Sequence, residues 1–280
     1  MGQKTKIDWC DSTWNPVTGC LHGCPYCYAR RIAERFSCEG QTLDAPAELQ
    51  RVWLKDGGAD LRQKGCHVLR YPVELKDSGR ICPYPFAFAP TFHRYKLDEP
   101  QHWKKPRTIF VCSMADLFGS WVPDEWVKAV FDACEKAPQH RYLFLTKAPE
   151  RFEILRRDGI TFPDNCWLGT SITRSSDACG KKNKVDSLTD SYDVPAVHWF
   201  ASVEPIFEEM QPEAIENLAM LDWVIIGAET GQRKDRVIPK KEWIMNIAKR
   251  CGYYRVPVFM KESLRGLMGP DFRQEFPWEV

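Results

Sequence analysis

Short apolar runs alternate with helix-like stretches from residue 107 onward in this 280-residue chain. The apolar runs span 108–112, 142–145, 166–168, 198–203, 223–226 and 256–260, and the clearest helical patterns span 124–136, 213–221 and 240–251. Continuous apolar strands that alternate with helices indicate a parallel sheet buried on both faces. With 7–10 as the first strand, we predict an α/β fold, a partial or near-complete (βα) barrel. A doubly wound open sheet is the alternative.

The first 106 residues are less regular. A helix is predicted over 27–36, because Ala29, Ile32, Ala33 and Phe36 recur at the spacing of one helical face. Residues 38–106 hold a strand-like pair, 51–54 and 67–75, and a proline-rich stretch, 82–106. We interpret 38–106 as an irregular insertion or lid within a single domain, 1–280.

Composition narrows the class of protein. Hydrophobic residues make up 44% of the chain, which is enough to bury a sizeable core, and the net charge of +1 argues against a protein that coats duplex nucleic acid. The sequence has no membrane-length apolar stretch and no secretory signal, so we expect a cytoplasmic protein. Twelve cysteines in such a chain should be mostly reduced and buried, and isolated ones such as Cys82 and Cys179 are interpreted as core or loop residues.

Polar or small residues follow nearly every predicted strand. In parallel barrels the carboxyl ends of the strands carry the active site. Ordinary strand termini are the competing interpretation, but six polar ends in succession favour the rim of a site. The candidates are Ser113 and Asp116, Thr146 and Lys147, Thr170 and Ser171, Ser202 and Glu204, Gly227 and Glu229, and Lys261.

Three cysteines, Cys20, Cys24 and Cys27, lie within eight residues on a Gly- and Pro-containing loop that leads into a helix. Thiolates are the ligands that hold iron–sulfur clusters, and three of them leave one iron of a 4Fe–4S cluster open. A structural zinc ion would need a fourth ligand. His22 is the nearest candidate, but it lies between two of the thiols, where chelation would be strained.

The C-x3-C-x2-C spacing, with Tyr26 directly before the last cysteine, resembles the signature of the radical S-adenosylmethionine (SAM) superfamily. The segments WCDSTWNPVTGCLHGCPYCY, FVCSMADLF, FLTKAPER, WLGTSI, SVEPIF and DWVIIGAETG further resemble a phage-associated three-cysteine branch of radical-SAM-like proteins. This resemblance covers nearly the whole chain outside 38–106. It implies a radical SAM-type (βα) barrel with two cofactors, a 4Fe–4S cluster on Cys20, Cys24 and Cys27, and SAM on the open iron.

The resemblance also implies roles for single residues. Tyr26 is expected at adenine. The stretch from Ser113 to Asp116 is expected at the amino group of SAM, although it departs from the Gly-Gly-Glu-type motif of the superfamily. Further SAM contacts are expected from Thr146, Lys147, Thr170, Ser171, Ser202 and Gly227, and substrate or ribose contacts from Glu204, Glu229 and Lys261. For each Glu and Lys, an ordinary salt bridge is the competing interpretation.

The expected activity is reductive cleavage of SAM to a 5′-deoxyadenosyl radical that abstracts hydrogen from a nucleotide or nucleoside. The near-neutral charge favours such a small substrate over a base within DNA or RNA, which is the alternative. A non-catalytic iron–sulfur or zinc-binding regulator is the hypothesis from another class. The resemblance further implies an external electron donor of the flavodoxin or ferredoxin type, and no membrane partner.

Overall fold

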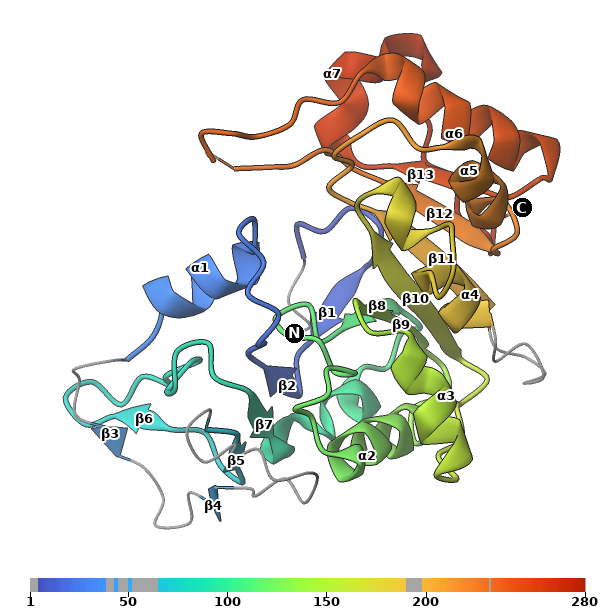
Figure 1. Ribbon diagram of the computed structural model, residues 1–280. Coiled ribbons are helices and arrows are strands. Elements are labelled where there is room, and N and C mark those ends of the chain that lie inside the picture. Colours follow the sequence, from blue (N-terminus) through green and yellow to red (C-terminus); the bar gives the residue numbers. More distant parts are fainter. Residues whose placement is uncertain are drawn as a thin grey trace. The chain divides into compact units, whose positions relative to one another are not determined.

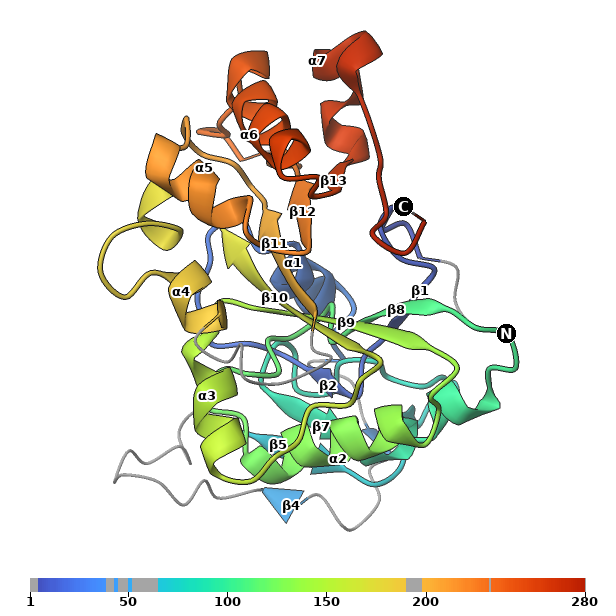
Figure 2. The ribbon, with the colours of Figure 1, turned by 90° about the vertical axis from the view of Figure 1, so that its right-hand side faces the viewer.

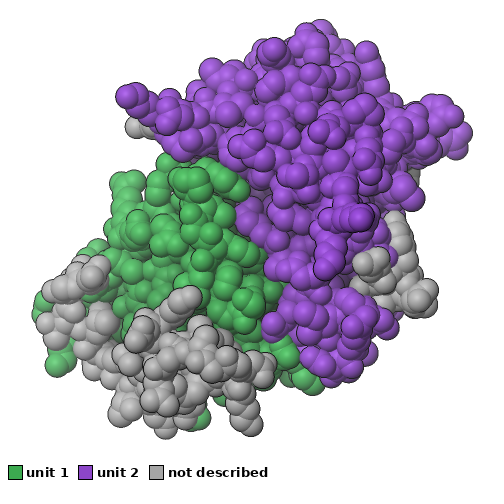
Figure 3. All heavy atoms as spheres, viewed as in Figure 1, with its two compact units in different colours: residues 1–4, 12–142 green, residues 5–11, 143–280 purple. Residues whose placement is uncertain are grey.

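A computed structural model describes residues 5–38, 43–44, 50–51, 65–189, 198–231 and 233–279, with the backbone alone at 43–44 and 50–51. The expected strand over 51–54 therefore lies mostly outside the described residues. The chain divides into two compact units, residues 1–4 and 12–142 (unit 1) and residues 5–11 and 143–280 (unit 2) (Figure 3).

Seven strands form one sheet in the order β1-β8-β9-β10-β11-β12-β13. Their bounds are Ser12–Trp14 (β1), Thr108–Val111 (β8), Arg141–Thr146 (β9), Cys166–Ile172 (β10), His198–Val203 (β11), Trp223–Ile226 (β12) and Val258–Met260 (β13). β1 pairs with β8 in parallel, and so does each neighbouring pair from β10 to β13. A doubly wound sheet would reverse its strand order part-way, so the sequential order confirms the predicted α/β fold of the partial (βα) barrel type.

Two predicted strand positions are wrong. The first strand is Ser12–Trp14 rather than 7–10, which forms a turn. β1 has two polar residues, but Ser12 is buried and accepts a hydrogen bond from Arg107, and Trp14 is fully buried. The fourth strand, β10, ends at Ile172 rather than at 168. Gly169, Thr170 and Ser171 therefore lie inside a buried strand.

Unit 1 contains a second sheet, of order β2-β7-β5-β4, and a two-stranded sheet, β3-β6 (Figure 1). The strands are Val17–Thr18 (β2), Leu43–Asp44 (β3), Gln50–Arg51 (β4), His67–Leu69 (β5), Glu74–Leu75 (β6) and Thr91–His93 (β7). β7, from the expected insertion, pairs antiparallel with β2, which lies just before the three cysteines. The unit's helices are α1 (Tyr28–Arg35) and α2 (Asp124–Glu135). That 38–106 is an insertion within a single domain stays a prediction.

Unit 2 carries α3 (Glu150–Arg157), α4 (Lys184–Thr189), α5 (Pro212–Leu218), α6 (Lys241–Tyr253) and α7 (Arg265–Met268). α5 and α6 lie side by side (Figure 2). Every residue of β10 and β12 is buried, as strands covered on both faces must be. Trp223 centres the core of the unit, with rings from Trp9, Phe200, Phe259 and Trp278 around it.

Most cysteines are free thiols, but Cys38 and Cys82 form a disulfide that closes a separation of 44 residues. The interpretation of Cys82 as an isolated core or loop thiol is therefore wrong. Spacing did not reveal the pair, because the two residues meet only when 82–84 folds back beside the end of α1, where Ser37 bridges Tyr84. None of the helices in the described parts of the chain has the length and apolar character needed to span a membrane.

Candidate functional site

The three-cysteine loop runs directly into α1. Cys27 is the N-cap residue of the helix, and its Sγ accepts a hydrogen bond from the backbone N–H of Arg30 at 3.3 Å. The N–H of Cys27 in turn donates to the carbonyl oxygen of Cys24 at 3.2 Å. The last thiol thus takes the place of the usual Ser or Asp cap, at the positive end of the helix. An anion held by this thiol would be favoured there.

Backbone contacts hold the start of the loop on both sides. The N–H of Gly19 donates to the carbonyl oxygen of Met114, and that of Cys20 donates to the carbonyl oxygen of Phe88. Gly19 has a φ of +84°, and a Cβ at this position would lie 2.2 Å from the carbonyl oxygen of Ala89. Only glycine meets both demands without strain. The segment around 88–89 therefore fixes the three-cysteine loop.

The thiols of Cys20 and Cys27 lie in apolar surroundings. The two cysteines and Tyr84 pack against a buried cluster of Ala29, Ala33, Phe88 and Met114. Burial is the main cause that raises the pKa of the Cys20 thiol to about 12, and the nearby Asp116 carboxylate and the other two cysteines contribute to that rise. The Arg30 guanidinium lies over the Phe88 ring at 4.9 Å and reaches the carbonyl oxygen of Cys20. The Cys20 thiol is therefore neutral without a metal, and binding a metal there must release its proton.

The donor set of this loop consists of three thiols, the type of ligand that holds iron–sulfur clusters. Among the described residues, no three His, Cys, Asp or Glu side chains converge on one ion. Ligands of a 4Fe–4S cluster bind different irons, so they stand apart rather than converging. The Nε2 atom of His22 lies 2.7 Å from the Asp116 carboxylate, and the His22 ring packs edge-on against Trp121. The three thiols fit a cluster with one open iron.

The residues after β8 are tied to this loop. Asn15 accepts hydrogen bonds from the Ser113 hydroxyl and from the N–H of Met114, and the Tyr28 hydroxyl donates to the carbonyl oxygen of Ser113 at 2.7 Å. Asp116 also accepts from the N–H of Phe118. Unit 1 thus brings Ser113 and Asp116 to the cysteine loop, with Tyr26 partly exposed on that loop. The sequence did not point to Asn15 or Tyr28, because their partners lie roughly ninety residues away in the chain.

A second group of predicted residues meets at the strand ends of unit 2. The Lys261 ammonium lies 2.5 and 2.7 Å from the two carboxylate oxygens of Glu204. Both side chains are half-buried, and a Cβ at Gly227 would lie 2.9 Å from Glu204 Oε1 and from Lys261 Cδ. The absence of a side chain at Gly227 therefore makes room for this ion pair. Carboxylate and ammonium together offer both signs of charge to a ligand.

Glu229 lies two residues beyond Gly227 and is buried, whereas its ion-pair partner, Arg233, is partly exposed. The guanidinium of Arg233 donates to both carboxylate oxygens, at 2.6 and 2.8 Å. The hydrogen bond from Arg233 holds the pKa of Glu229 below its usual value, so this carboxylate is ionised at neutral pH. Such a fork-to-fork pair fixes both side chains. It also ties the loop after β12 to the end of that strand.

The Ser and Thr residues predicted to contact SAM at the strand ends of unit 2 lie largely inside the sheet. Thr146, Thr170, Ser171 and Ser202 are buried. The Thr170 hydroxyl donates to the carbonyl oxygen of Thr146, and the Thr146 hydroxyl accepts from the N–H of Ala148. Lys147 follows β9 and is partly exposed. Contacts of these residues with SAM stay predictions.

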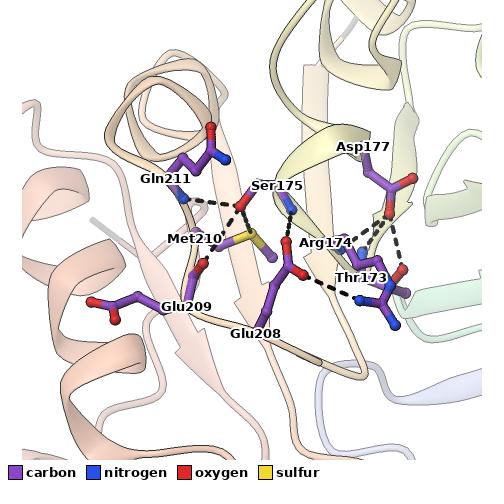
Figure 4. Close-up of polar contacts among 8 residues, drawn as sticks. All are labelled: Thr173, Arg174, Ser175, Asp177, Glu208, Glu209, Met210 and Gln211. Carbon is purple, nitrogen blue, oxygen red and sulfur yellow. Dashed lines mark hydrogen bonds and ion pairs between the residues drawn. The ribbon is translucent and has the colours of Figure 1, made fainter.

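The loops after β10 and β11 are joined by a polar network that the sequence did not reveal (Figure 4). Glu208 accepts from the N–H of Ser175 at 2.9 Å and from the Arg174 guanidinium at 3.2 Å. Asp177 accepts from the N–H groups of Thr173 and Arg174 and from the Thr173 hydroxyl. Ser175 further contacts the carbonyl oxygen of Glu209, the Met210 sulfur and the N–H of Gln211. This network fixes two loops beside the Glu204 strand end.

One family model matches residues 4–266, that of the proteins of unknown function designated DUF5131. No curated protein matches the chain.

The fold is similar to that of spore photoproduct lyase. A structure of that enzyme complexed with dinucleoside spore photoproduct gives a TM-score of 0.50 at 11% identity, covering 93% of this chain and 79% of the lyase. A tyrosine-to-phenylalanine mutant gives the same TM-score and identity, with coverage of 93% and 78%. A third structure, a double mutant with bound AdoMet and dinucleoside spore photoproduct, gives 0.46, and the chain spans only 63% of its length. The likeness shows the fold, a partial (βα) barrel.

Proposed function

We propose that this chain, which belongs to the DUF5131 family, is a radical SAM enzyme that carries a 4Fe–4S cluster on Cys20, Cys24 and Cys27. One observation carries the proposal. Three thiols stand on a single glycine-shaped loop that caps α1. This is the ligand set of a cluster with one open iron, on a fold of the matching type.

When bound, such a cluster supplies an electron that cleaves SAM to a 5′-deoxyadenosyl radical, which takes a hydrogen atom from the substrate. The residues of the chain bind, orient and exclude water. The amino end of α1 and the Arg30 guanidinium place positive charge beside the anionic thiolates. Phe88, Met114, Ala29 and Ala33 keep water from Cys20 and Cys27.

The proposed SAM contacts of unit 1 are Tyr26 at adenine and Ser113 with Asp116 at the amino group. Asp116 is oriented by His22 and by the N–H of Phe118, and the carbonyl oxygen of Ser113 by the Tyr28 hydroxyl, so we assign the amino group to this carboxylate and this carbonyl oxygen. These acceptors suit an ammonium, which has three donors and no acceptor.

The proposed contacts of unit 2 centre on the strand ends. Glu204 and Lys261, beside Gly227, provide a carboxylate for ribose or substrate hydroxyls and an ammonium for an anionic group. Glu229 is oriented by Arg233 for a similar role. Thr146, Lys147, Thr170, Ser171 and Ser202 complete the set as minor contacts or as supports of the strands.

The proposed substrate is a nucleotide or nucleoside. Spore photoproduct lyase was solved with a dinucleoside photoproduct, which favours a second candidate, a base within DNA or RNA. The electron is proposed to come from an external flavodoxin- or ferredoxin-type protein. A regulator without turnover is the opposing hypothesis, and cleavage of SAM distinguishes the two.

The test is anaerobic reconstitution with iron, sulfide, SAM and dithionite, followed by measurement of 5′-deoxyadenosine with a panel of nucleotides and oligonucleotides. We expect wild type to bind iron and cleave SAM, and C24A to lose both. C10A is the matched control, since Cys10 is a partly exposed thiol outside the loop, and it should behave as wild type. Normal iron content and SAM cleavage in C24A would overturn the assignment.

A further inference from the structure

The loop between β12 and α6 is unusually basic for this chain. Of the nine residues 233–241, five are Lys or Arg and one is acidic, whereas the whole chain has 39 basic and 38 acidic residues. The loop projects from the sheet of unit 2 as the orange segment before α6 (Figure 1). Most of its side chains are exposed, including Ile238, which is 73% exposed. An exposed basic segment of this density is a binding surface for anions.

Two of the five basic groups hold the loop in place. Arg233 makes the fork-to-fork pair with Glu229, and Lys241 binds Asp271 at 2.6 Å and the carbonyl oxygen of Met268 at 3.1 Å. These contacts fix the loop at its two ends. They do not account for the basic residues in the middle of the loop.

Three cations remain for a ligand: Lys234, Arg236 and Lys240. All three are exposed, and within the described residues none of them forms an ion pair. Arg236 uses one guanidinium nitrogen on the carbonyl oxygen of Gly231, and the Lys240 ammonium stands 6.0 Å from the Trp243 ring centre. Three unpaired cations spaced over seven residues suit a chain of phosphates rather than one phosphate group.

The loop starts at the end of the strand that carries Gly227 and Glu229. Arg233 bonds Glu229 directly, so the anion-binding segment is tied to the residues proposed to face the substrate. We infer that Lys234, Arg236 and Lys240 bind the phosphate backbone of a nucleic acid whose base is the substrate. This inference rests on the proposed function and develops its second candidate substrate, a base within DNA or RNA.

The test is the salt dependence of oligonucleotide binding. Each phosphate contact to a single strand contributes a slope of about −0.7 in a plot of log affinity against log salt, so three contacts contribute about −2. Between about 50 and about 200 mM salt, the advantage of wild type over K234Q/R236Q/K240Q should therefore shrink roughly 20-fold. Binding of a labelled single-stranded oligonucleotide to the reconstituted enzyme is followed by fluorescence anisotropy.

The control is K104Q/K136Q/K249Q, which removes the same charge from three dispersed, exposed lysines and should keep the wild-type slope. A loop variant with the wild-type slope, an equal change in the dispersed variant, or a mononucleotide that wild type binds as tightly as the oligonucleotide would each overturn the inference. SAM cleavage without substrate is measured in parallel. If wild type cleaves SAM and the slopes are equal, only this inference fails; if wild type cleaves no SAM, the proposed function fails.

Discussion

Replacing Gly19 by alanine probes how tightly the cluster loop is built. A residue other than glycine at a φ of +84° costs about 1–2 kcal/mol. The new Cβ would also meet the carbonyl oxygen of Ala89 at 2.2 Å and its carbon at 2.4 Å, which are backbone atoms that cannot rotate away. Displacing them adds about 1–3 kcal/mol, the usual cost of overpacking. We therefore expect G19A to lower the free energy of unfolding by about 2–5 kcal/mol.

Gly23 offers a matched control in the same loop. Its φ is +69°, but nothing lies within 4 Å of an added Cβ, so G23A should cost only the backbone component, about 1–2 kcal/mol. Urea unfolding of the cluster-free protein, followed by tryptophan fluorescence, gives both values. Iron per chain after reconstitution shows whether the loop still holds its thiols, and we expect a larger loss for G19A. Equal destabilisation and equal iron content in the two variants would refute the close approach to Ala89.

Two further predictions concern charged groups of unit 2. Removing Glu208 leaves the N–H of Ser175 without its acceptor, so E208A should lower the free energy of unfolding, measured by thermal unfolding, by about 1–3 kcal/mol. The exposed Glu209 side chain bonds only Asn246 among the described residues, so E209A should lower it by under about 0.5 kcal/mol. Equal losses would count against the network. Because the pKa of Glu229 is lowered in the folded state, its pairing stabilises the fold above the unfolded pKa of 4.5, and that contribution is lost as pH falls through the folded pKa. The unfolding free energy of E229Q should therefore fall less with acid than that of wild type, and parallel pH profiles would contradict the assignment.

The sequence predicted those parts of the fold where hydrophobic pattern and burial coincide. β8, β11 and β12 are continuous apolar runs, and their predicted bounds hold almost to the residue. β1 was misplaced because Ser12 and Thr13 do not look like strand residues until Arg107 supplies a partner for the Ser12 hydroxyl. The hydrophobic pattern indicates burial only on average, whereas a polar side chain with a hydrogen-bond partner can also be buried.

The candidate site, too, was only partly predictable from the sequence. The cysteine loop was easy to single out because its three cysteines are local in sequence. The pairing of Glu204 with Lys261 joins residues 57 positions apart, and the Cys38–Cys82 disulfide joins residues 44 apart. Single residues at strand ends could be nominated from the sequence, but their partners are decided by strand register and loop path. Neither can be obtained from one sequence.

The hydrogen bond from the N–H of Arg30 to the Cys27 sulfur would couple loading of the proposed cluster to the stability of α1. α1 has only eight residues, too few to persist by itself in water, so its first turn depends on its cap. A thiolate accepts that bond more strongly than a thiol does, and so loading with iron should slow amide hydrogen exchange in the first turn of α1. By reciprocity, whatever frays this turn would weaken the hold of Cys27 on the proposed cluster.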